Sequence, residues 1–315
     1  MVRVIVTGGA GFIGSHIVDL LVSKKFGVYS LDNYKTVGEK SGYRNKKAHY
    51  TKCDIRDFNA LKKHFLRIRP KYVFHTAALA RIQPSIKDPD TYLAVNSGGT
   101  LNVLKAAKAA GAKRVIYSAS SSAYGLNPIP SKEAMLPHPL NPYAQTKLAG
   151  EYWMKVFASV YGLETVSLRY FNVYGPRNPF TGAYTTVVTK FLHFYQNNMP
   201  MTIVGDGRQT RDYTHVNDVA RANLLAAFSK KVGNGEVINI GCSKKYSVNQ
   251  VAEFIGGTSL GKLLKNSAAE FIPPRQGEAR HTLADITLAK KLLGWSPKVK
   301  FETGISELKK IYELV

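Results

Sequence analysis

The amino-acid sequence predicts an α/β protein: a doubly wound parallel sheet joined to a smaller mixed α/β domain. Three observations carry this prediction. Short β-branched runs alternate with helical patterns over residues 1–170, which is typical of strand–helix–strand units. Glycines at a spacing of three follow the first run, at Gly8, Gly11 and Gly14. From residue 173 the alternation breaks, and a second unit of mixed structure begins.

The first stretch, residues 2–14, predicts a phosphate-binding turn. Its apolar run at residues 2–6 is too short for a helix and is typical of a strand buried on both faces. From Phe12 and Ile13 onward, apolar residues repeat at helical spacing. The glycines let the backbone turn sharply and approach a pyrophosphate, and free N–H groups at the helix start bind it. This combination is typical of a dinucleotide-binding Rossmann domain.

The second strand, predicted at residues 28–32, ends in an acid. Asp32 comes 18 residues after Gly14 and is followed by Asn33. A carboxylate there accepts hydrogen bonds from the adenosine ribose hydroxyls and repels a 2′-phosphate. We therefore expect NAD rather than NADP, although the cations Lys35 and Arg44 follow shortly and weaken this preference.

Length and composition bound the class of protein. The 315 residues are 44% hydrophobic, enough for a sizeable core in one large or two modest domains. No apolar run is long enough to span a membrane, and the chain starts with a core strand, so neither a membrane partner nor a signal peptide is expected. Cys53 and Cys242 are the only cysteines. This excludes a disulfide framework, predicts a cytoplasmic protein and leaves no cysteine metal motif.

The net charge of +23 has two interpretations. It could mark a nucleic-acid surface or a generally basic surface. The lysines form scattered doublets, such as Lys24-Lys25 and Lys62-Lys63, rather than one dense run. We therefore do not expect nucleic acid as a partner. A basic surface also attracts a doubly charged nucleotide-sugar, so the net charge does not strongly discriminate between nucleic acid and a nucleotide-sugar as the ligand.

Further strands of the first unit are predicted at residues 49–53, 72–75, 114–118 and 164–169, with long helices at 94–110 and 143–161. In a doubly wound sheet, ligands bind beyond the carboxyl ends of the strands. After the third strand, Asp54 and Ile55 either hold the adenine, or Asp54 caps the helix that begins near residue 57. After the fourth, His75 is interpreted as a packed polar residue, and the small Ala77 and Ala78 let a cofactor pass closely.

The end of the fifth strand and the start of the next helix carry the candidate chemistry. A serine cluster at residues 118–122 follows the strand, although it could be only a polar loop. Tyr143 and Lys147 lie four residues apart, on one helix face. An ammonium beside a phenol favours the phenolate and lowers its pKa. Such a phenol can take a proton from a sugar hydroxyl.

The second half is predicted to be less regular. A loop at 178–182, a helix at 185–197, a short strand at 202–204 and a charged turn at 205–212 come first. A helix at 216–228, a strand at 237–240 that rejoins the main sheet and a helix near 286–293 follow. Residues 1–172 plus 215–242 are thus predicted to bind the dinucleotide. Residues 173–214 plus 243–315 are predicted to form a domain that closes over the carboxyl edge.

Several segments together resemble the extended short-chain dehydrogenase/reductase superfamily, and most closely its nucleotide-sugar 4-epimerases of the UDP-glucose/UDP-N-acetylglucosamine type. They are TGGAGFIG, HTAALA, SASSSAYG, NPYAQTK, LRYFNVYGPR, GDGRQTRDYTHVNDVA and PPRQGEARHTLAD. The similarity spans residues 2–295. It implies a retained NAD, a UDP-sugar substrate and a homodimer formed through the helices at 94–110 and 143–161.

The resemblance also implies residue roles. Ser120 would orient the sugar O4, Tyr143 would be the base, and Lys147 would bind the nicotinamide ribose. The candidate cofactor contacts are Gly8, Gly11, Phe12, Ile13, Gly14, Asp32, Asn33, Asp54, Ile55, Ala77, Ala78, Asn96, Ser118, Tyr143, Lys147 and Tyr170. The candidate substrate contacts are Ser120, Ser121, Tyr143, Asn172, Val187, Arg211, Arg275, Glu278 and Thr282. Among these, Asn172 and the two arginines are expected on the diphosphate, because guanidinium groups bond phosphate in pairs.

The resemblance further implies which reaction and which sugars to expect. Dehydratases and decarboxylases of the superfamily carry an acid beside the active-site hydroxyl, whereas Ser121, Ser122 and Ala123 follow Ser120 here. Simple 4-epimerisation is therefore expected: the base takes the O4 proton, a hydride passes to NAD, the 4-keto sugar swings about its pyrophosphate, and the hydride returns to the other face. Thr282 matches a position that gates sugar size. It leaves room for an N-acetyl group, so UDP-GlcNAc/UDP-GalNAc are expected beside UDP-glucose/UDP-galactose.

The sequence departs from the family pattern at two positions, and two alternative functions stay open. Ala80 stands where some epimerases carry a lysine, and Glu278 where an aspartate often follows the arginine. A UDP-glucuronate 4-epimerase or a related sugar-nucleotide enzyme stays open, and its carboxylate substrate would need a partner near C6. A non-catalytic NAD- or RNA-binding relative is the other alternative. The intact Ser120, Tyr143 and Lys147 count against it, because a protein that only binds has no need of a tuned phenol.

Overall fold

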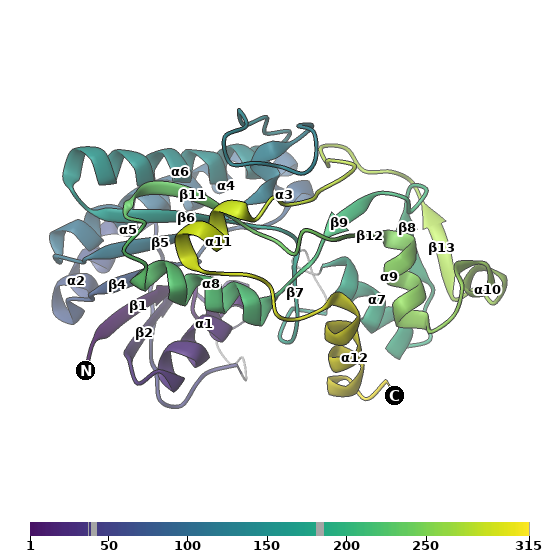
Figure 1. Ribbon diagram of the computed structural model, residues 1–315. Helices are drawn as coiled ribbons and strands as arrows, with labels where there is room; N and C mark the ends of the chain where they lie inside the picture. Colours follow the sequence, from purple (N-terminus) through teal and green to yellow (C-terminus); the bar gives the residue numbers. More distant parts are fainter. Residues whose placement is uncertain (37, 39–42, 181–185, 315) are drawn as a thin grey trace.

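The computed structural model describes residues 1–36, 38, 43–180 and 186–314. Its central feature is a sheet of seven parallel strands in the order β11-β6-β5-β4-β1-β2-β3 (Figure 1). The strands are β1 (Arg3–Thr7), β2 (Gly27–Asp32), β3 (His49–Lys52), β4 (Tyr72–His75), β5 (Arg114–Ser120), β6 (Glu164–Tyr170) and β11 (Asn234–Ile240). Because all neighbours pair in parallel, every strand has its carboxyl end at the same edge of the sheet.

The strand order reverses at β1, which pairs with β2 on one side and with β4 on the other. Thr7, at the end of β1, is in register with Leu31 and His75. A crevice forms above such a switch point, because the connections on its two sides leave in opposite directions. The glycine turn that follows β1 therefore lies where this fold places a ligand.

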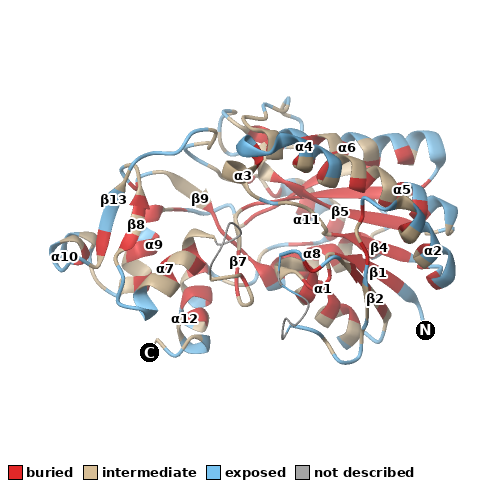
Figure 2. Cartoon of the chain, turned by 180° about the vertical axis from the view of Figure 1, so that it is seen from behind, coloured by how far each residue is buried: buried red, intermediate tan, exposed pale blue. Residues whose placement is uncertain are grey.

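Helices cover both faces of the sheet. One layer contains α2 (Phe58–Ile68), α5 (Gly99–Ala109) and α6 (Pro142–Tyr161), and the other contains α1 (Phe12–Ser23), α8 (Val216–Phe228) and α11 (Thr287–Leu293). The central strands β1, β4, β5 and β6 are almost fully buried (Figure 2), as a parallel sheet covered on both faces requires.

Helix α6 owes its position to strong local signals at both ends. The Asn141 side chain accepts a hydrogen bond from Ala144 N at 2.9 Å, and Pro142 occupies the first turn. Gly162, with φ of 64°, ends the helix in a left-handed conformation. An asparagine cap, a proline in the first turn and a terminal glycine are the residues that suit these positions. They set the register of the helix that carries Tyr143 and Lys147.

The second unit has its own core (Figure 1). It contains α7 (Val187–Gln196), β8 (Met201–Val204), β9 (Thr210–Asp212), β12 (Lys245–Ser247), α9 (Val248–Gly256), α10 (Leu260–Lys265), β13 (Ala269–Ile272) and α12 (Phe301–Ile311). Strand β13 pairs with β8, and β12 pairs with β9. Helices α3 (Ile82–Lys87) and α4 (Pro89–Tyr92) follow β4 in the first unit and pack on α6. Strands β7 (Val173–Tyr174) and β10 (Thr214–His215) pair with each other where the chain passes between the two units.

The structure confirms the predicted strands and α8, and β11 rejoins the main sheet beside β6 as expected. The helix predicted at 94–110 begins with a π-helical segment, η1 (Leu93–Gly98), before α5. The helix predicted at 185–197 is α7, which starts at Val187; Thr185 lies outside the described residues, as does Gly182 of the predicted loop at 178–182.

One segment contradicts the predicted domain division. Residues 284–295 were expected in the second domain, but Ala289, Leu293 and Trp295 pack in the core of the first unit. The reason is that α11 turns its apolar stripe onto α8 and β11, and Trp295 Nε1 donates a hydrogen bond to Asp218 O at 3.0 Å.

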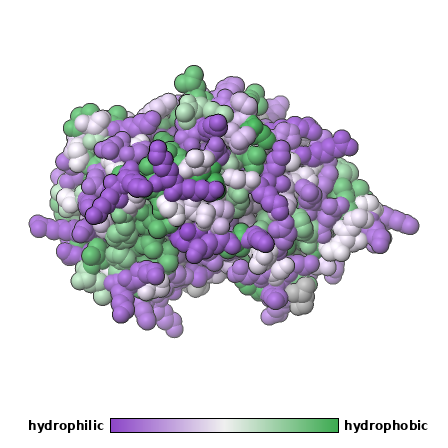
Figure 3. All heavy atoms as spheres, viewed as in Figure 1, coloured by the Kyte–Doolittle hydropathy of each residue, from purple (hydrophilic) through white to green (hydrophobic). Residues whose placement is uncertain are grey.

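The visible surface mixes hydrophilic and hydrophobic side chains. On the face seen in Figure 3, hydrophilic residues are spread over both halves of the molecule with hydrophobic ones between them. No helix in the described part of the chain is long and apolar enough to cross a membrane.

Candidate active site

A cavity of about 1150 Å³ runs along the carboxyl edge of the sheet and reaches into the second unit. Its walls come from the turn after β1, the loops after β2, β4, β5 and β6, helix α7 and residues 275–282. The volume exceeds that of a typical pocket for one small ligand, about 300–1,000 Å³. It suits two ligands bound end to end.

The glycine turn is packed too tightly for side chains. Gly8 has φ of 71°, and a Cβ there would lie 2.7 Å from Ala77 N. A Cβ on Gly14 would collide with the carbonyl oxygen of Gly8. Gly11 precedes α1 with no side-chain cap, and Phe12 and Ile13 line the cavity. The first N–H groups of α1 are therefore available to an anion.

Asp32 lies at the end of β2 beside this turn, as predicted. Its Oδ2 accepts a hydrogen bond from Ala10 N at 3.0 Å and its Oδ1 accepts one from Tyr34 N at 2.8 Å. Burial raises the pKa of Asp32, and these bonds with the charge of Arg44 oppose that rise. A carboxylate oxygen has lone pairs left for a ribose hydroxyl. The Arg44 guanidinium lies 4.4 Å above the Tyr34 ring.

Asp54 is not the cap of α2, so that interpretation is wrong. The cap is Asp57, which accepts a hydrogen bond from Ala60 N at 2.9 Å. Asp54 instead binds Arg56 at 2.8 Å and Asn33 Nδ2 at 3.1 Å. The hydrogen bond from Arg56 lowers the pKa of Asp54 to about 2. Asn33 and Ile55 line the cavity, whereas Asp54 stands behind Asn33.

The loop after β4 passes over the turn. Ala77 and Ala78 line the cavity. His75 is packed, as interpreted from the sequence: its ring nitrogens lie 2.7 Å from Thr7 Oγ1 and 2.9 Å from Thr100 Oγ1. Asn96 is buried and does not line the cavity. Its amide exchanges hydrogen bonds of 2.8 and 3.0 Å with the backbone of Leu79, which does line it. Asn96 therefore holds the loop in place.

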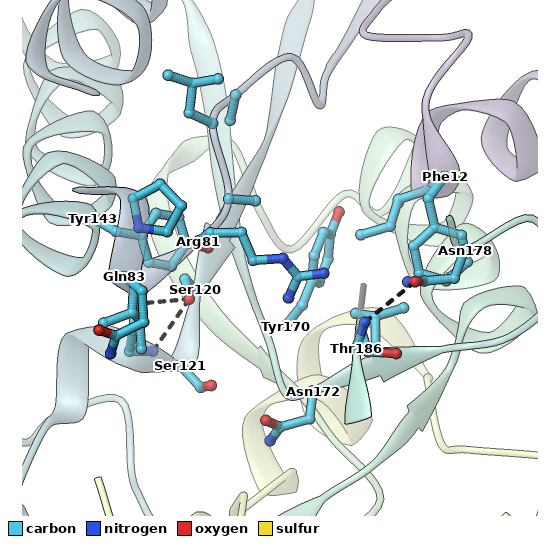
Figure 4. Close-up of a pocket in the computed structure, with 18 of the residues that line it drawn as sticks. Phe12, Arg81, Gln83, Ser120, Ser121, Tyr143, Tyr170, Asn172, Asn178 and Thr186 are labelled. Atoms are coloured by element: carbon cyan, nitrogen blue, oxygen red, sulfur yellow. Dashed lines mark hydrogen bonds between the residues drawn. The ribbon is translucent and has the colours of Figure 1, made fainter. Parts of the chain in front are cut away.

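Ser120 and Tyr143 meet at the cavity wall (Figure 4). Ser120 ends β5, Tyr143 lies in the first turn of α6, and the Ser120 hydroxyl is close enough to lower the pKa of the phenol. Burial raises the pKa of Tyr143, and the Ser120 hydrogen bond and the charge of Arg81 lower it only in part. The expected lowering of the phenol pKa by Lys147 is thus not found in this structure.

Lys147 lies one helical turn beyond Tyr143 and is buried. Its Nζ is 4.3 Å from the centroid of the Tyr117 ring. Burial lowers the pKa of Lys147 to about 7, and the charge of Glu151 opposes this. Desolvation weakens the effect that the spacing predicted, since a buried amine loses its proton more easily.

Tyr170 lines the cavity at the end of β6, and Ser118 supports it from behind. The Tyr170 hydroxyl lies 3.1 Å from Ser118 Oγ and accepts a hydrogen bond from Asn223 Nδ2 at 2.7 Å. Burial raises the pKa of Tyr170 to about 12. Tyr170 therefore stays a neutral phenol. The phenol that lies beside Ser120 is that of Tyr143.

The substrate end begins at Asn172. This residue has φ of 31°, a backbone conformation that non-glycine residues rarely adopt and that is often found at functional sites. Its Nδ2 donates hydrogen bonds to Asp212 O at 3.1 Å and to Thr282 Oγ1 at 3.0 Å. Both amide hydrogens are thereby used, so contact with a diphosphate requires one of these bonds to exchange.

Val187, Arg211, Arg275 and Glu278 line the same end of the cavity. The Arg211 guanidinium donates hydrogen bonds to Thr210 O at 3.1 Å and to Arg280 O at 2.9 Å, and lies 3.4 Å from Glu278. These bonds fix the plane of the guanidinium. Ser121 lines the wall next to Ser120 (Figure 4).

Sequence reasoning missed three basic residues of the wall, Arg56, Arg81 and Lys190. Arg81 directly follows HTAALA and points into the middle of the cavity, between Tyr143 and Phe12 (Figure 4). Its position just after a strand end was a usable signal. Lys190 lies on α7 and donates a hydrogen bond to Thr202 Oγ1 at 2.8 Å. Burial and the charge of Arg275 lower its pKa; no sequence pattern pointed to it.

The cavity favours anionic ligands. Its described basic lining residues are Lys35, Arg56, Arg81, Lys190, Arg211 and Arg275, and its described acids are Asp32 and Glu278. Such an excess attracts negatively charged ligands. No group of three or more potential metal ligands occurs among the residues that the structure describes.

A glycine turn, a strand-end acid and a serine–tyrosine pair on one parallel sheet define an extended short-chain dehydrogenase/reductase of the nucleotide-sugar type. Residues 4–241 match the NAD dependent epimerase/dehydratase family. The chain belongs to this family and, within it, to the UDP-sugar 4-epimerases.

Three relatives show the range of this group. The UDP-glucose 4-epimerase of Thermotoga maritima, solved with UDP-glucose, is 37% identical with a TM-score of 0.91 over 99% of both chains. The UDP-N-acetylglucosamine 4-epimerase of Methanobrevibacter ruminantium, solved with UDP-N-acetylmuramic acid, is 36% identical with a TM-score of 0.88 over 99% of this chain and 98% of that one. The UDP-glucuronate 4-epimerase of Thermodesulfobacterium geofontis is 34% identical over 96% of this chain and 93% of its own.

NAD is the cofactor of this family, and the residues present fit it. A pyrophosphate fits the start of α1, where no side chain caps the helix. The backbone at Gly8 and Gly14 carries no Cβ atoms, so the turn can pack closely there. The Asp32 carboxylate suits a ribose that carries free hydroxyls. Bound there, NAD supplies a hydride acceptor, while the protein supplies position and electrostatics.

Proposed function

We propose that this chain interconverts UDP-glucose and UDP-galactose by NAD-dependent inversion at the sugar C4. The observation that carries the proposal is the placing of Ser120 and Tyr143 together in the wall of a cavity that also holds the glycine turn. Tyr143 takes the proton of O4, and Ser120 orients that oxygen. NAD bound at the glycine turn would accept the hydride from C4 and return it to the opposite face of the 4-keto sugar. Arg211 and Arg275 would hold the diphosphate meanwhile.

The groups around Ser120 support plain epimerisation. Ser122 donates a hydrogen bond to Ser120 Oγ at 2.8 Å, and Ser121 lines the wall. Among the described lining residues, the acids Asp32 and Glu278 lie elsewhere, one beside the glycine turn and one beside Arg211. Elimination of water or CO2 would need an acid or base at the serine cluster.

We include UDP-GlcNAc and UDP-GalNAc among the proposed substrates. Thr282 lines the cavity, and its short side chain leaves room where a larger one would exclude an N-acetyl group. The similarity to the Methanobrevibacter ruminantium enzyme supports this extension.

UDP-glucuronate is a second candidate substrate, and a specific observation favours it. A carboxylate on C6 needs a cationic partner near the reacting end of the sugar. Arg81 points into the cavity beside Tyr143 and carries a charge that acts on that phenol (Figure 4). A guanidinium pairs well with a carboxylate. The similarity to the Thermodesulfobacterium geofontis enzyme agrees with this alternative.

The test is turnover without added cofactor. Purified protein is incubated separately with UDP-glucose, UDP-GlcNAc and UDP-glucuronate, and NMR follows the configuration at C4. Conversion of UDP-glucose supports the main proposal, and the three rates rank the substrates. Tyr143→Phe should lose about 10²–10⁴-fold in kcat while still binding UDP. Failure of all three, with NAD supplied, would overturn the proposal and favour a binding protein.

Arg81→Gln separates the candidate sugars. If Arg81 reads a carboxylate, kcat/KM for UDP-glucuronate falls by about tenfold or more, since a lost charge-assisted bond costs about 1.5–3 kcal/mol, and UDP-glucose turnover changes little. Equal losses for both substrates would exclude this role.

We propose a homodimer through η1, α5 and α6. Leu93 of η1 and Tyr152, Val156 and Val160 of α6 are exposed apolar residues on these helices. Light scattering after gel filtration measures the mass, and Val160→Glu should yield a monomer. A wild-type mass equal to one chain at micromolar concentration would exclude the dimer.

A further inference from the structure

Glu151 and Arg169 form a buried ion pair beneath α6. Arg169 Nε donates a hydrogen bond to Glu151 Oε1 at 2.9 Å, and Nη2 donates one to Oε2 at 2.7 Å. Their side chains are 2% and 3% exposed. Burying two charges costs several kcal/mol per ion before their attraction is counted, so such a pair is weak evidence for stability. Its position suggests another role.

That position is one helical turn beyond Lys147, on the same helix. Residues four apart on a helix face the same side. Lys147 is itself buried. No salt bridge joins it directly to Glu151 among the described residues, because Arg169 occupies both carboxylate oxygens. Glu151 therefore acts on Lys147 through its charge.

The other groups around Lys147 do not supply a negative charge. The Tyr117 ring, from β5, lies 4.3 Å from Nζ. His75, from β4, is buried and neutral: burial, then the charge of Lys147, lower the pKa of His75 to about 3. Tyr143, on α6, has a raised pKa because of burial. Among the described residues, Glu151 is thus the carboxylate whose charge acts on Lys147.

We propose that Glu151 is a positioning residue: its carboxylate, held by the fork of Arg169, is the buried counter-charge that favours the ammonium form of Lys147. Without a nearby anion, a buried ammonium gives up its proton. Arg169 prevents Glu151 from taking that proton itself, because two charge-assisted hydrogen bonds favour the ionised carboxylate. Burial alone would lower the pKa of Arg169, but its bonds with Glu151 raise it.

The consequence appears in the pH dependence of Lys147. With Glu151 in place, the pKa of Lys147 is about 7. Removal of the carboxylate lowers that pKa further, so the charged fraction of Lys147 near neutral pH falls. A neutral amine cannot stabilise the phenolate that Tyr143 forms. This last step rests on the proposed function; the titration of Lys147 does not.

The experiment is an NMR titration of protein labelled at the lysine Cε, with the Lys147 signal assigned by its loss in Lys147→Met. In Glu151→Gln, the titration midpoint should fall by about one pH unit or more, the shift that a close opposite charge produces. Glu164→Gln is the matched control, because Glu164 also pairs with an arginine, Arg114, at 2.8 Å. It should leave the midpoint unchanged. An unchanged midpoint in Glu151→Gln would overturn the proposal.

A second variant covers the case in which Glu151→Gln does not fold. Glu151→Gln/Arg169→Gln removes both charges and leaves no uncompensated ion. Its Lys147 midpoint should also fall, and a midpoint equal to the wild type would reject the role.

Activity supplies an independent readout. The alkaline limb of kcat against pH should move to lower pH in Glu151→Gln, whereas a purely structural defect lowers kcat equally at every pH. If the wild type turns over no UDP-sugar while the NMR midpoint shifts, the proposed function fails and the role of Glu151 stands. If the wild type is active and the Lys147 midpoint does not move in Glu151→Gln, the proposed function stands and the role of Glu151 is rejected.

Discussion

Thr282 Oγ1 accepts a hydrogen bond from Asn172 Nδ2 at 3.0 Å and another from Asp212 N at 3.2 Å. The residue proposed to set sugar size is thus in direct contact with a residue expected at the substrate diphosphate. The bonds also join three separate segments of chain at one wall of the cavity. Position 282 therefore has two separable properties, the volume of its side chain and the oxygen that it offers.

The volume is tested by Thr282→Tyr. We expect kcat/KM for UDP-GlcNAc to fall by about tenfold or more, because a filled pocket rejects the larger group, while UDP-glucose stays within a few-fold of the wild type. Steady-state kinetics on both substrates measure this ratio. A parallel loss for both sugars would contradict a size gate.

The oxygen is tested by Thr282→Val, which keeps the volume. Asn172 Nδ2 and Asp212 N lose their acceptor, and an unsatisfied buried donor costs about 1–3 kcal/mol. We expect the free energy of unfolding to fall by that amount in guanidinium titrations. Thr282→Ser keeps the oxygen and should stay close to the wild type; equal effects of both substitutions would show that the hydroxyl is not what matters.

Ser120→Ala should change the pH dependence of turnover. The Ser120 hydrogen bond lowers the pKa of Tyr143, which burial otherwise raises. Removing that bond leaves the pKa higher, so the rising limb of kcat against pH moves to higher pH. At neutral pH we expect kcat to fall by about 10²-fold. A profile that keeps its shape and only drops in height would mean that Ser120 does not act on the phenol.

Gly14→Ala should abolish retention of NAD. The added Cβ would collide with the Gly8 carbonyl oxygen, so the turn must open. The cofactor content of purified protein, released by acid and measured by absorbance, should drop below about a tenth of the wild type, for a loss of roughly 1.4 kcal/mol or more. Gly261→Ala is the control, because a Cβ there meets no atom within 4 Å. Full NAD content in Gly14→Ala would exclude this site.

Acid should destabilise the fold through buried histidines. Burial lowers the pKa of His75 to about 3 and that of His215 to about 4. Both are neutral in the folded state, whereas in the unfolded state they take up protons below about pH 6.5. The unfolded state then binds more protons, so the free energy of unfolding falls as the pH drops below about 6.5 and levels off below the folded pKa values.

The check is denaturant unfolding at several pH values. Each such histidine contributes a slope of up to about 1.4 kcal/mol per pH unit in that window. His75→Asn should reduce the slope by about one proton in that window. Identical slopes in the wild type and in His75→Asn would show that His75 is not the group responsible.

Local patterns were sufficient for much of this protein. The glycine turn, Asp32, and the spacing of Tyr143 and Lys147 were all legible in the chain. Each depends on residues close in sequence, so strand and helix periods with capping residues predict them. The same patterns located every strand of the central sheet.

Long-range packing decided the rest. Trp295 joins the core of the first unit rather than the second because α11 finds its apolar partners there. Arg81 points into the cavity and Lys147 is buried, and no periodicity reports such directions. The pKa values of the site also depend on long-range packing. Spacing alone places an ammonium near a phenol. Only the folded protein determines how far burial lowers the pKa of Lys147 and raises that of Tyr143, because desolvation depends on everything packed around them.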